Sequence, residues 1–435
     1  MKLTLIFFVV VFFCCSYRCC CMCLKLHFFL FSLWKHHLIS MTTVARSDRY
    51  HIAVFGRRNA GKSSLVNCLA GQEISIVSNV AGTTTDTVWK NIELPGVGAA
   101  VIADTAGFDD AGELGTKRVD AARKVLARAD VAILLLGEYD DDASLEKEWY
   151  ADFVSQRIPV ILLAGKCDWK GSEARIEEWN SVFGSAAIPF SAVSGEGREA
   201  LLERIAQLYK QDDNLDDITH SLVKPGDIVV LVMPQDVSAP KGRIIQPQVQ
   251  TLRNLLDKHC ITLCCAPEEL PSLLQSLVAP PQLIITDSQV FAMVEKLTPP
   301  ETKLTSFSVL MARHKGDIGV FCNGAKALLA LPPTAHVLIA EACSHIPQNE
   351  DIGRVKLPRL LRSKLGDGLS IDVVGGNDFP DDLSGYDIVI HCGACMFNRR
   401  SVLSRVRQAN VQGVPITNYG VAIAALNGIL EKVTV

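Results

Sequence analysis

The stretch His51-Ile-Ala-Val-Phe-Gly-Arg-Arg-Asn-Ala-Gly-Lys-Ser63 joins an apolar run to a glycine-containing loop, and a helical Ser64-Leu-Val-Asn-Cys-Leu-Ala70 follows it. A strand, this loop and a helix in that order predict a P-loop, in which glycines let backbone N–H groups close around phosphates at a helix N-terminus. In such a loop Lys62 reaches the β- and γ-phosphates and Ser63 ligates Mg²⁺. The sequence therefore predicts an α/β nucleotide-binding domain. Its predicted loop contacts are Gly56, Asn59, Ala60, Gly61, Lys62, Ser63 and Ser64.

Three further segments follow the P-loop at the intervals of a GTPase rather than of a general ATPase. Gly82-Thr-Thr-Thr-Asp86 resembles the first switch, and Asp104-Thr-Ala-Gly107 resembles the second. Ser191-Ala-Val193 resembles a loop that contacts the base, so Ser191 and Ala192 are further candidates for nucleotide binding. GTP and Mg²⁺ are the expected cofactors of this domain.

The two switch segments are expected to respond to hydrolysis. The GTPase pattern implies that Thr84 holds Mg²⁺ and that Asp104 contacts the ion through water, while the amide of Gly107 senses the γ-phosphate. Loss of that phosphate would then release both switches. We expect Lys62, Asn59, Thr84 and Gly107 to be the catalytic residues.

The guanine-reading motif of GTPases is normally Asn-Lys-x-Asp, and here it reads Gly165-Lys-Cys-Asp168 after an apolar run at residues 160–164. Asp168 can still accept from the ring N–H and the exocyclic amine of guanine, and Lys166 can still cover the base. The missing amide corresponds to one hydrogen bond, worth about 0.5–1.5 kcal/mol. We therefore expect guanine preference to survive with weaker affinity.

Asn59, together with the Gly82–Asp86 segment, resembles translation- and tRNA-associated GTPases in which this asparagine helps to place K⁺. That resemblance implies K⁺ as the element that stabilises the developing charge. The sequence shows no evident arginine finger, because Arg57 and Arg58 are explained as surface residues beside the loop. For Glu113 two interpretations stay open, orientation of the attacking water and a place in a solvated loop.

Two half-motifs rich in thiols and imidazoles lie far apart in the C-terminal part of the chain. They are Cys343-Ser-His345 and His391-Cys-Gly-Ala-Cys395, and each follows an apolar run, at residues 335–340 and 386–390, that predicts a buried strand. Parallel strands leave their carboxyl ends at one edge of a sheet, so we expect the half-motifs to meet. Thiolates select zinc, copper(I) or iron–sulfur clusters. A structural zinc site and buried cysteines beside unrelated histidines remain the alternatives.

The length of 435 residues suggests two or three domains at about 150 residues each. We expect a three-domain α/β chain, with a P-loop GTPase domain over residues 41–212 followed by two smaller α/β domains with parallel sheets. These cover residues 220–312 and 313–435, and an acidic break near residues 210–217 separates them from the first domain. The last domain is expected to contain a helix over residues 323–331.

The net charge of −4 and the pI near 6.2 argue against a nucleic-acid partner, whose binding depends on Lys and Arg facing phosphates. Six of the 15 cysteines lie in the first 40 residues, and the others fit a reducing compartment, where free thiols persist. In one apolar, strand-like stretch we expect core packing rather than metal ligation for Cys260, Cys264 and Cys265.

Residues 1–40 are apolar and rich in Phe and Cys. One interpretation is an upstream extension of the gene model, with the working protein starting at Met41. The other is a genuine targeting or anchoring segment. For residues 41–435 we expect no membrane association.

A K⁺-type GTPase joined to Cys-x-His and His-Cys-x-x-Cys resembles the HydF family, the maturation GTPases of iron–iron hydrogenase, over residues 41–435. The segments at 56–63 and 82–86 and the stretch Glu341-Ala-Cys-Ser-His345 match the pattern of that family. The resemblance implies a middle dimerisation domain and a C-terminal domain that holds a 4Fe-4S cluster. The implied thiolate ligands are Cys343, Cys392 and Cys395, with His345, His391 or an exchangeable ligand at the fourth iron.

The same resemblance implies a scaffold function. The protein would carry a two-iron precursor assembled with the radical maturases HydE and HydG and deliver it to the apo-hydrogenase, as a homodimer or dimer of dimers. A reducing, anaerobic compartment would be its location, either the cytoplasm or an organelle such as a hydrogenosome or plastid. The rival hypothesis is a ribosome- or tRNA-associated GTPase whose C-terminal thiols bind structural zinc.

Overall fold

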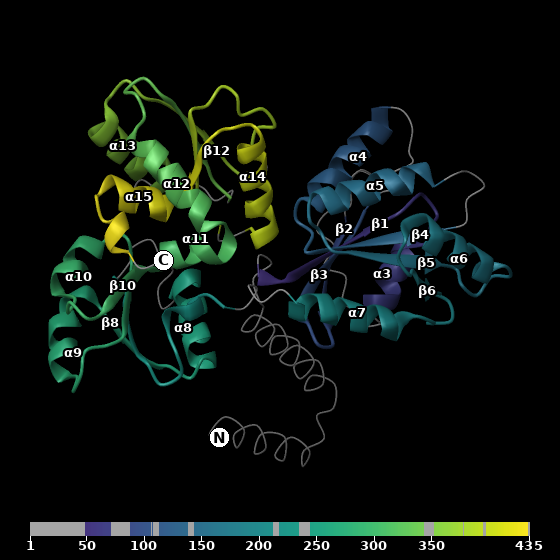
Figure 1. The fold of residues 1–435 in the computed structure, drawn as a ribbon, viewed down its shortest axis with the longest axis horizontal. Helices are drawn as coiled ribbons and strands as arrows, with labels where there is room; N and C mark the ends of the chain where they lie inside the picture. Colours follow the sequence, from purple (N-terminus) through teal and green to yellow (C-terminus); the bar gives the residue numbers. More distant parts are fainter. Residues whose placement is uncertain are drawn as a thin grey trace, which may run out of the picture. The chain divides into compact units, whose positions relative to one another are not determined.

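A computed structural model describes residues 48–70, 88–105, 107, 113–137, 143–211, 217–234, 244–342, 352–376, 378–394 and 397–433. These residues form three β-sheets with helices packed on them (Figure 1). Among them, no helix combines the length and the apolar character needed to cross a bilayer. The segment predicted as an N-terminal extension, residues 1–40, lies outside the described part of the chain.

The first sheet has the order β2-β3-β1-β4-β5-β6, and it is parallel except for β2, which runs antiparallel to β3. The central strand β1 is buried along its whole length, with Ile52 and Val54 in one core and Ala53 and Phe55 in the other. Helices α3 and α7 pack in the core that contains Ile52 and Val54. Helices α4, α5 and α6 pack in the core that contains Ala53 and Phe55. The strands are β1 Tyr50–Phe55, β2 Val88–Leu94, β3 Gly98–Asp104, β4 Val131–Leu136, β5 Val160–Gly165 and β6 Ile188–Phe190. The helices are α3 Lys62–Ala70, α4 Glu113–Leu126, α5 Ser144–Ser155, α6 Ser172–Phe183 and α7 Arg198–Gln211.

The second sheet is parallel throughout, in the order β10-β9-β7-β8. Its strands are β7 Ile228–Val232, β8 Ile261–Cys265, β9 Leu283–Thr286 and β10 Lys303–Ser306. The helices of this region are α8 Gln246–Asp257, α9 Leu270–Ser276, α10 Phe291–Leu297 and α11 Phe307–Lys315, with 3₁₀ turns at η2 His220–Leu222 and η3 Pro267–Glu269.

The third sheet, also parallel, has the order β12-β11-β13-β14. Its strands are β11 His336–Ala340, β12 Ser370–Val374, β13 Ile388–His391 and β14 Ile416–Asn418. The helices are α12 Ile318–Leu329, α13 Leu357–Leu365, α14 Arg399–Val411 and α15 Tyr419–Leu426, with a π-helical turn at η4 Ile352–Lys356 and a 3₁₀ turn at η5 Leu430–Lys432. The α/β fold class expected from the sequence, with two smaller parallel-sheet units after the first domain, is confirmed.

Helix α11 connects the second and third sheets through a common core. Its residues Val309 and Ala312 pack in one cluster with Val230 of β7 and Leu338 of β11. On its other side, Leu310 joins a separate core beneath the second sheet. Since one helix is buried from both sides, we infer that the two smaller α/β units stabilise each other.

The helix expected over residues 323–331 is present with shifted bounds, and the expected core position of Cys264 is wrong. Helix α12 begins at Ile318 rather than near residue 323, because Asp317 caps it by accepting a hydrogen bond from the backbone N–H of Val320. Cys264 is exposed instead of lying in the core. It sits on β8 at the edge of the second sheet, where alternate residues point to opposite faces, so that its neighbour Cys265 is the buried one.

Candidate functional site: a nucleotide loop and a thiol edge

The P-loop leaves the end of β1 in a conformation that requires glycine at its first position. Gly56 has φ of 155°, and a Cβ atom there would lie 2.7 Å from the carbonyl oxygen of Leu135. The Nζ of Lys62 donates to the carbonyls of Gly56 and Arg57 at 2.9 and 2.7 Å, which holds the buried ammonium inside the loop. Asn59, at φ of 60°, is exposed. The loop thus keeps its cation inside and its asparagine at the surface.

Arg57 is not the surface residue that the sequence suggested. Its Nε and Nη2 donate to the two carboxylate oxygens of Glu146 at 2.6 and 2.9 Å, and both side chains are buried. Glu146 lies in the first turn of α5, so this bidentate pair ties the P-loop to that helix. A guanidinium engaged in this way positions the loop, whereas the neighbouring Arg58 is exposed.

The switch residues are described in part. Asp104 ends β3 directly beside Val54 of β1, so its carboxylate is placed at the strand edge from which the P-loop leaves. Thr105 anchors this edge by donating from Oγ1 to the carbonyl of Val54 at 2.6 Å. Gly107 is described, while the whole first switch, including Thr84, and the Glu113 side chain lie outside the described residues.

The guanine-reading segment follows β5 at the same edge of the sheet. Lys166, at φ of 59°, places its Nζ 4.5 Å from the ring centroid of Trp169, and Asp168 is exposed. Gly165 packs closely, since a Cβ there would lie 3.4 Å from the carbonyl of Ala60 in the P-loop and 3.2 Å from Leu135. The departure from the usual asparagine therefore falls where this segment touches the phosphate loop.

Two residues near the base-reading segments have structural roles. The hydroxyl of Ser191 accepts hydrogen bonds from the backbone N–H groups of Val193 and Ser194, both at 3.2 Å, which shapes the loop after β6. The neighbouring Ala192 is half-buried. Burial, followed by the charge of Glu196, raises the pKa of Cys167 to about 11, so this thiol stays protonated at neutral pH.

The two thiol half-motifs follow neighbouring strands, as expected. Strands β11 and β13 pair in parallel with Ala340 opposite His391, and the N–H of Cys392 donates to the carbonyl of Ala340 at 2.9 Å. The Sγ of Cys392 in turn accepts from the backbone N–H groups of Ala342 at 3.0 Å and Ala394 at 3.4 Å. Such donors stabilise a thiolate, and one comes from the residue just before Cys343 and the other from within the second half-motif.

Of the other four candidate ligands, His391 lies in the described part of the chain. Cys343, His345 and Cys395 lie outside the described residues. Within the described part of the chain, no group of three or more His, Cys, Asp or Glu side chains is arranged to hold a metal ion. His391 is fully buried, with Nδ1 2.8 Å from the Cys392 carbonyl and Nε2 3.0 Å from Nη1 of Arg405.

Three family models match this chain. A model described as "50S ribosome-binding GTPase" covers residues 51–166. The "Hydrogen maturase F dimerization domain" covers residues 218–316, and the "Hydrogen maturase F tetramerization domain" covers residues 319–434. The chain belongs to the HydF family. Cys392 and the other predicted thiol ligands all fall in the region of the tetramerization model.

Curated relatives outside this family share the GTPase part of a HydF chain. The tRNA modification GTPase MnmE of Mannheimia succiniciproducens is 37% identical over 160 residues, which is 36% of this chain and 34% of the relative. MnmE of Xanthomonas euvesicatoria pv. vesicatoria is 36% identical over 166 residues, or 38% and 35% of the two chains. The chain therefore spans about a third of the length of these relatives.

Two solved structures align with parts of this chain. Era of Aquifex aeolicus bound to GDP and AlF4⁻ aligns at 21% identity, with a TM-score of 0.32, over 52% of this chain and 97% of that one. The G domain of the T. maritima FeoB iron transporter aligns at 26% identity, with a TM-score of 0.28, over 37% and 98%.

Two functional side chains in this HydF chain were missed by sequence reasoning, Glu146 and Arg405. Glu146 reaches its partner across 89 residues of sequence, and Arg405 reaches His391 across 14. Neither residue belongs to a motif. The sequence signal for a buried role of these side chains was weak, because each is a single charged residue among the positions that its helix buries.

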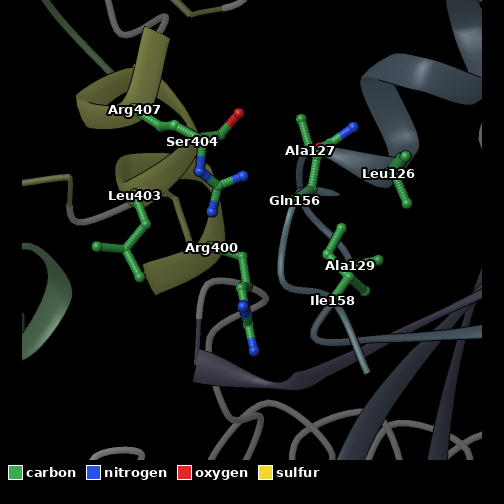
Figure 2. A pocket seen from close by; sticks show the side chains of 9 residues that line it. All are labelled: Leu126, Ala127, Ala129, Gln156, Ile158, Arg400, Leu403, Ser404 and Arg407. Carbon is green, nitrogen blue, oxygen red and sulfur yellow. The ribbon is translucent and has the colours of Figure 1, made fainter. Parts of the chain in front are cut away.

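Figure 2 shows a further pocket, which residues of α14 help to line. Arg400 of α14 borders it and donates from Nη1 to the carbonyl of Arg157 at 3.1 Å. The pocket contains no predicted nucleotide or thiol residue, and we assign it no function. Its lining residues are Leu126, Ala127, Ala129, Gln156, Ile158, Arg400, Leu403, Ser404 and Arg407.

Proposed function

We propose that this HydF-type GTPase holds a 4Fe-4S cluster and acts as a scaffold in hydrogenase maturation. Its cargo is a two-iron precursor, assembled with the radical maturases HydE and HydG and delivered to apo iron–iron hydrogenase in a reducing, anaerobic compartment. Under this proposal the chain comprises a GTPase domain over 41–212, a dimerisation domain over 220–312 and a cluster-binding domain over 313–435. The proposed cluster ligands are Cys343, Cys392 and Cys395.

The observation that carries this proposal is the environment of Cys392. Its sulfur receives one backbone N–H from the residue just before Cys343 and another from within the second half-motif. A sulfur that accepts two backbone N–H groups is better suited to be an anionic ligand of iron than an inert core thiol. When bound, a cluster with three thiolate ligands supplies one iron whose fourth position is open or labile, which suits a protein that hands over a metal group.

The test is anaerobic reconstitution of the full chain with iron and sulfide, followed by metal and sulfide counting. We expect a brown protein with four irons in each cluster. Colourless protein with stoichiometric zinc would contradict the proposal and restore the rival, a ribosome- or tRNA-associated GTPase. That rival has little support, because the family models over residues 218–316 and 319–434 are those of HydF.

The nucleotide site supports GTP hydrolysis with Mg²⁺ at Ser63 and Thr84, and we propose that K⁺ stimulates it. Asn59 is exposed at the tip of the loop, where its amide oxygen is free to take part in a cation site together with the first switch. K⁺ placed there would offset charge that develops on the phosphoryl group. Hydrolysis rates in K⁺ and Na⁺ test this, and equal rates, or a K⁺ effect that survives Asn59→Ala, would remove the role of Asn59.

The assembly proposed for the chain is a homodimer or a dimer of dimers. The two C-terminal family models, which are described as dimerization and tetramerization domains, support it. Light scattering of the purified chain measures this directly, and a monomer at micromolar concentration would contradict it.

A further inference from the structure

Arg405 places a buried guanidinium beside the cysteine end of the thiol site. The side chain lies on α14 and is 8% exposed. Its Nη1 donates to Nε2 of His391 at 3.0 Å, and its Nη2 donates to the carbonyl of Gly376. The rings of Phe379 and Phe397 each have their centroid 4.7 Å from its Cζ. Two hydrogen bonds and two aromatic faces therefore hold the guanidinium in one place.

The charge of Arg405 is not balanced by a carboxylate among its contacts in the described part of the chain. Those contacts are an imidazole, a carbonyl and two rings. Burial lowers the pKa of Arg405 to about 10, the charge of the Cys392 thiolate raises it, and the positive charge of Arg128 lowers it, so the group is charged at neutral pH. Burying a cation costs several kcal/mol, of which a cation–π contact offsets about 2. A thiolate at Cys392, as the proposed cluster ligand, would supply a complementary negative charge.

His391 connects this cation to the backbone of Cys392. The carbonyl of Cys392 only accepts, so Nδ1 of His391 carries the proton, and Arg405 only donates, so Nε2 keeps its lone pair. With one ring nitrogen donating and the other accepting, the imidazole is neutral. Both ring nitrogens are therefore engaged within the chain.

We propose that His391 and Arg405 are positioning residues of the cluster site: His391 is a neutral spacer rather than an iron ligand, and Arg405 fixes a positive charge that raises the reduction potential of the bound cluster. This inference rests on the proposed function. A cluster gains a negative charge on reduction, so a nearby cation stabilises the reduced form more than the oxidised form. Removing the cation should make the cluster harder to reduce.

The test compares Arg405→Met and Arg405→Lys in the reconstituted full chain. We expect both to keep the wild-type iron count, with a more negative reduction potential for Met and a potential near wild type for Lys, which restores the charge. Arg407→Met removes the same charge from the same helix and should leave the potential unchanged. If Arg405→Met does not fold, Arg405→Gln replaces it. Full iron with an unchanged potential in the neutral variant would overturn the proposal.

A second experiment tests the assignment of His391 as a spacer. In His391→Gln the amide oxygen can accept from Arg405, so we expect unchanged iron content and an unchanged paramagnetic spectrum of the reduced cluster. A strongly coupled ring nitrogen that disappears in this variant would make His391 an iron ligand and overturn its assignment as a spacer. The metal content of the wild-type chain distinguishes a failure of the proposed function from a failure of this inference alone. Zinc in place of iron ends the proposed function and this inference together, whereas a normal cluster that ignores Arg405 ends only the inference.

Discussion

The nucleotide site and the thiol site both lie at carboxyl ends of parallel strands, but they depend on different lengths of chain. The P-loop is one continuous segment, and its lysine is held by carbonyls of Gly56 and Arg57, six and five residues away. The sulfur of Cys392 instead receives a hydrogen bond from Ala342, 50 residues earlier. The first site therefore forms with its own strand and helix, whereas the second exists only when β11 and β13 have paired.

The largest expected effect concerns the continuous site. Lys62→Ala removes the cation from the loop, and we expect GTP hydrolysis to fall at least about 100-fold, since charge on the transferring phosphoryl group loses its stabilisation. Iron content after reconstitution should match wild type, because the thiol site lies on another sheet. Loss of both GTP hydrolysis and iron binding in this variant would mean that the two sites do not fold independently.

The converse change is Cys392→Ser. We expect the loss of most of the iron with GTP hydrolysis retained, because a hydroxyl is a much poorer ligand for iron–sulfur clusters than a thiolate. Cys343→Ser and Cys395→Ser should behave alike, and hydrogenase maturation should fail in all three. Cys265→Ser, in the core of the second sheet, serves as the comparison and should keep its iron. Full iron content in any of the three would remove that cysteine from the ligand set.

A smaller effect tests the buried ion pair between the nucleotide loop and α5. Glu146→Ala removes the buried carboxylate that pairs with Arg57, and we expect the GTPase domain to lose about 3–5 kcal/mol of unfolding free energy. Denaturant unfolding measures it. Glu148→Ala on the exposed face of α5 should stay within about 0.5 kcal/mol of wild type. If the two variants are equally stable, the buried pair does not support the loop.

The smallest expected effect is at Gly165. Restoring asparagine regains one hydrogen bond to guanine, so GDP binding should tighten by less than about tenfold. Part of that gain is offset because the new Cβ meets Ala60 and Leu135 at 3.4 and 3.2 Å, which requires small shifts in the P-loop. Calorimetric titration with GDP measures the change, and Gly385→Asn, at an exposed position where a Cβ meets open space, controls for surface effects. Weaker binding in Gly165→Asn would show that the packing cost dominates.

Much of the architecture was predictable because its signals are local. The apolar run of β1, the glycines after it and Lys62 are consecutive, so the strand, loop and helix follow from one short stretch. The pairing of β11 with β13 was predictable from the apolar runs before the two half-motifs. An error such as the late start for α12 arose because its N-cap, Asp317, lies outside the apolar pattern that marked the helix.

The sequence by itself determined the GTPase motifs, the parallel-sheet fold class and the five sulfur and imidazole candidates. The tertiary structure alone decided that Arg57 pairs with Glu146 and that Arg405 donates to His391, since the partners come from different segments of the chain. It also decided that Cys264 faces outward, which depends on β8 being an edge strand. Burial and charge pairing are properties of the packed chain. Motif spacing reports which groups are present, and only packing decides which of them share one low-dielectric environment.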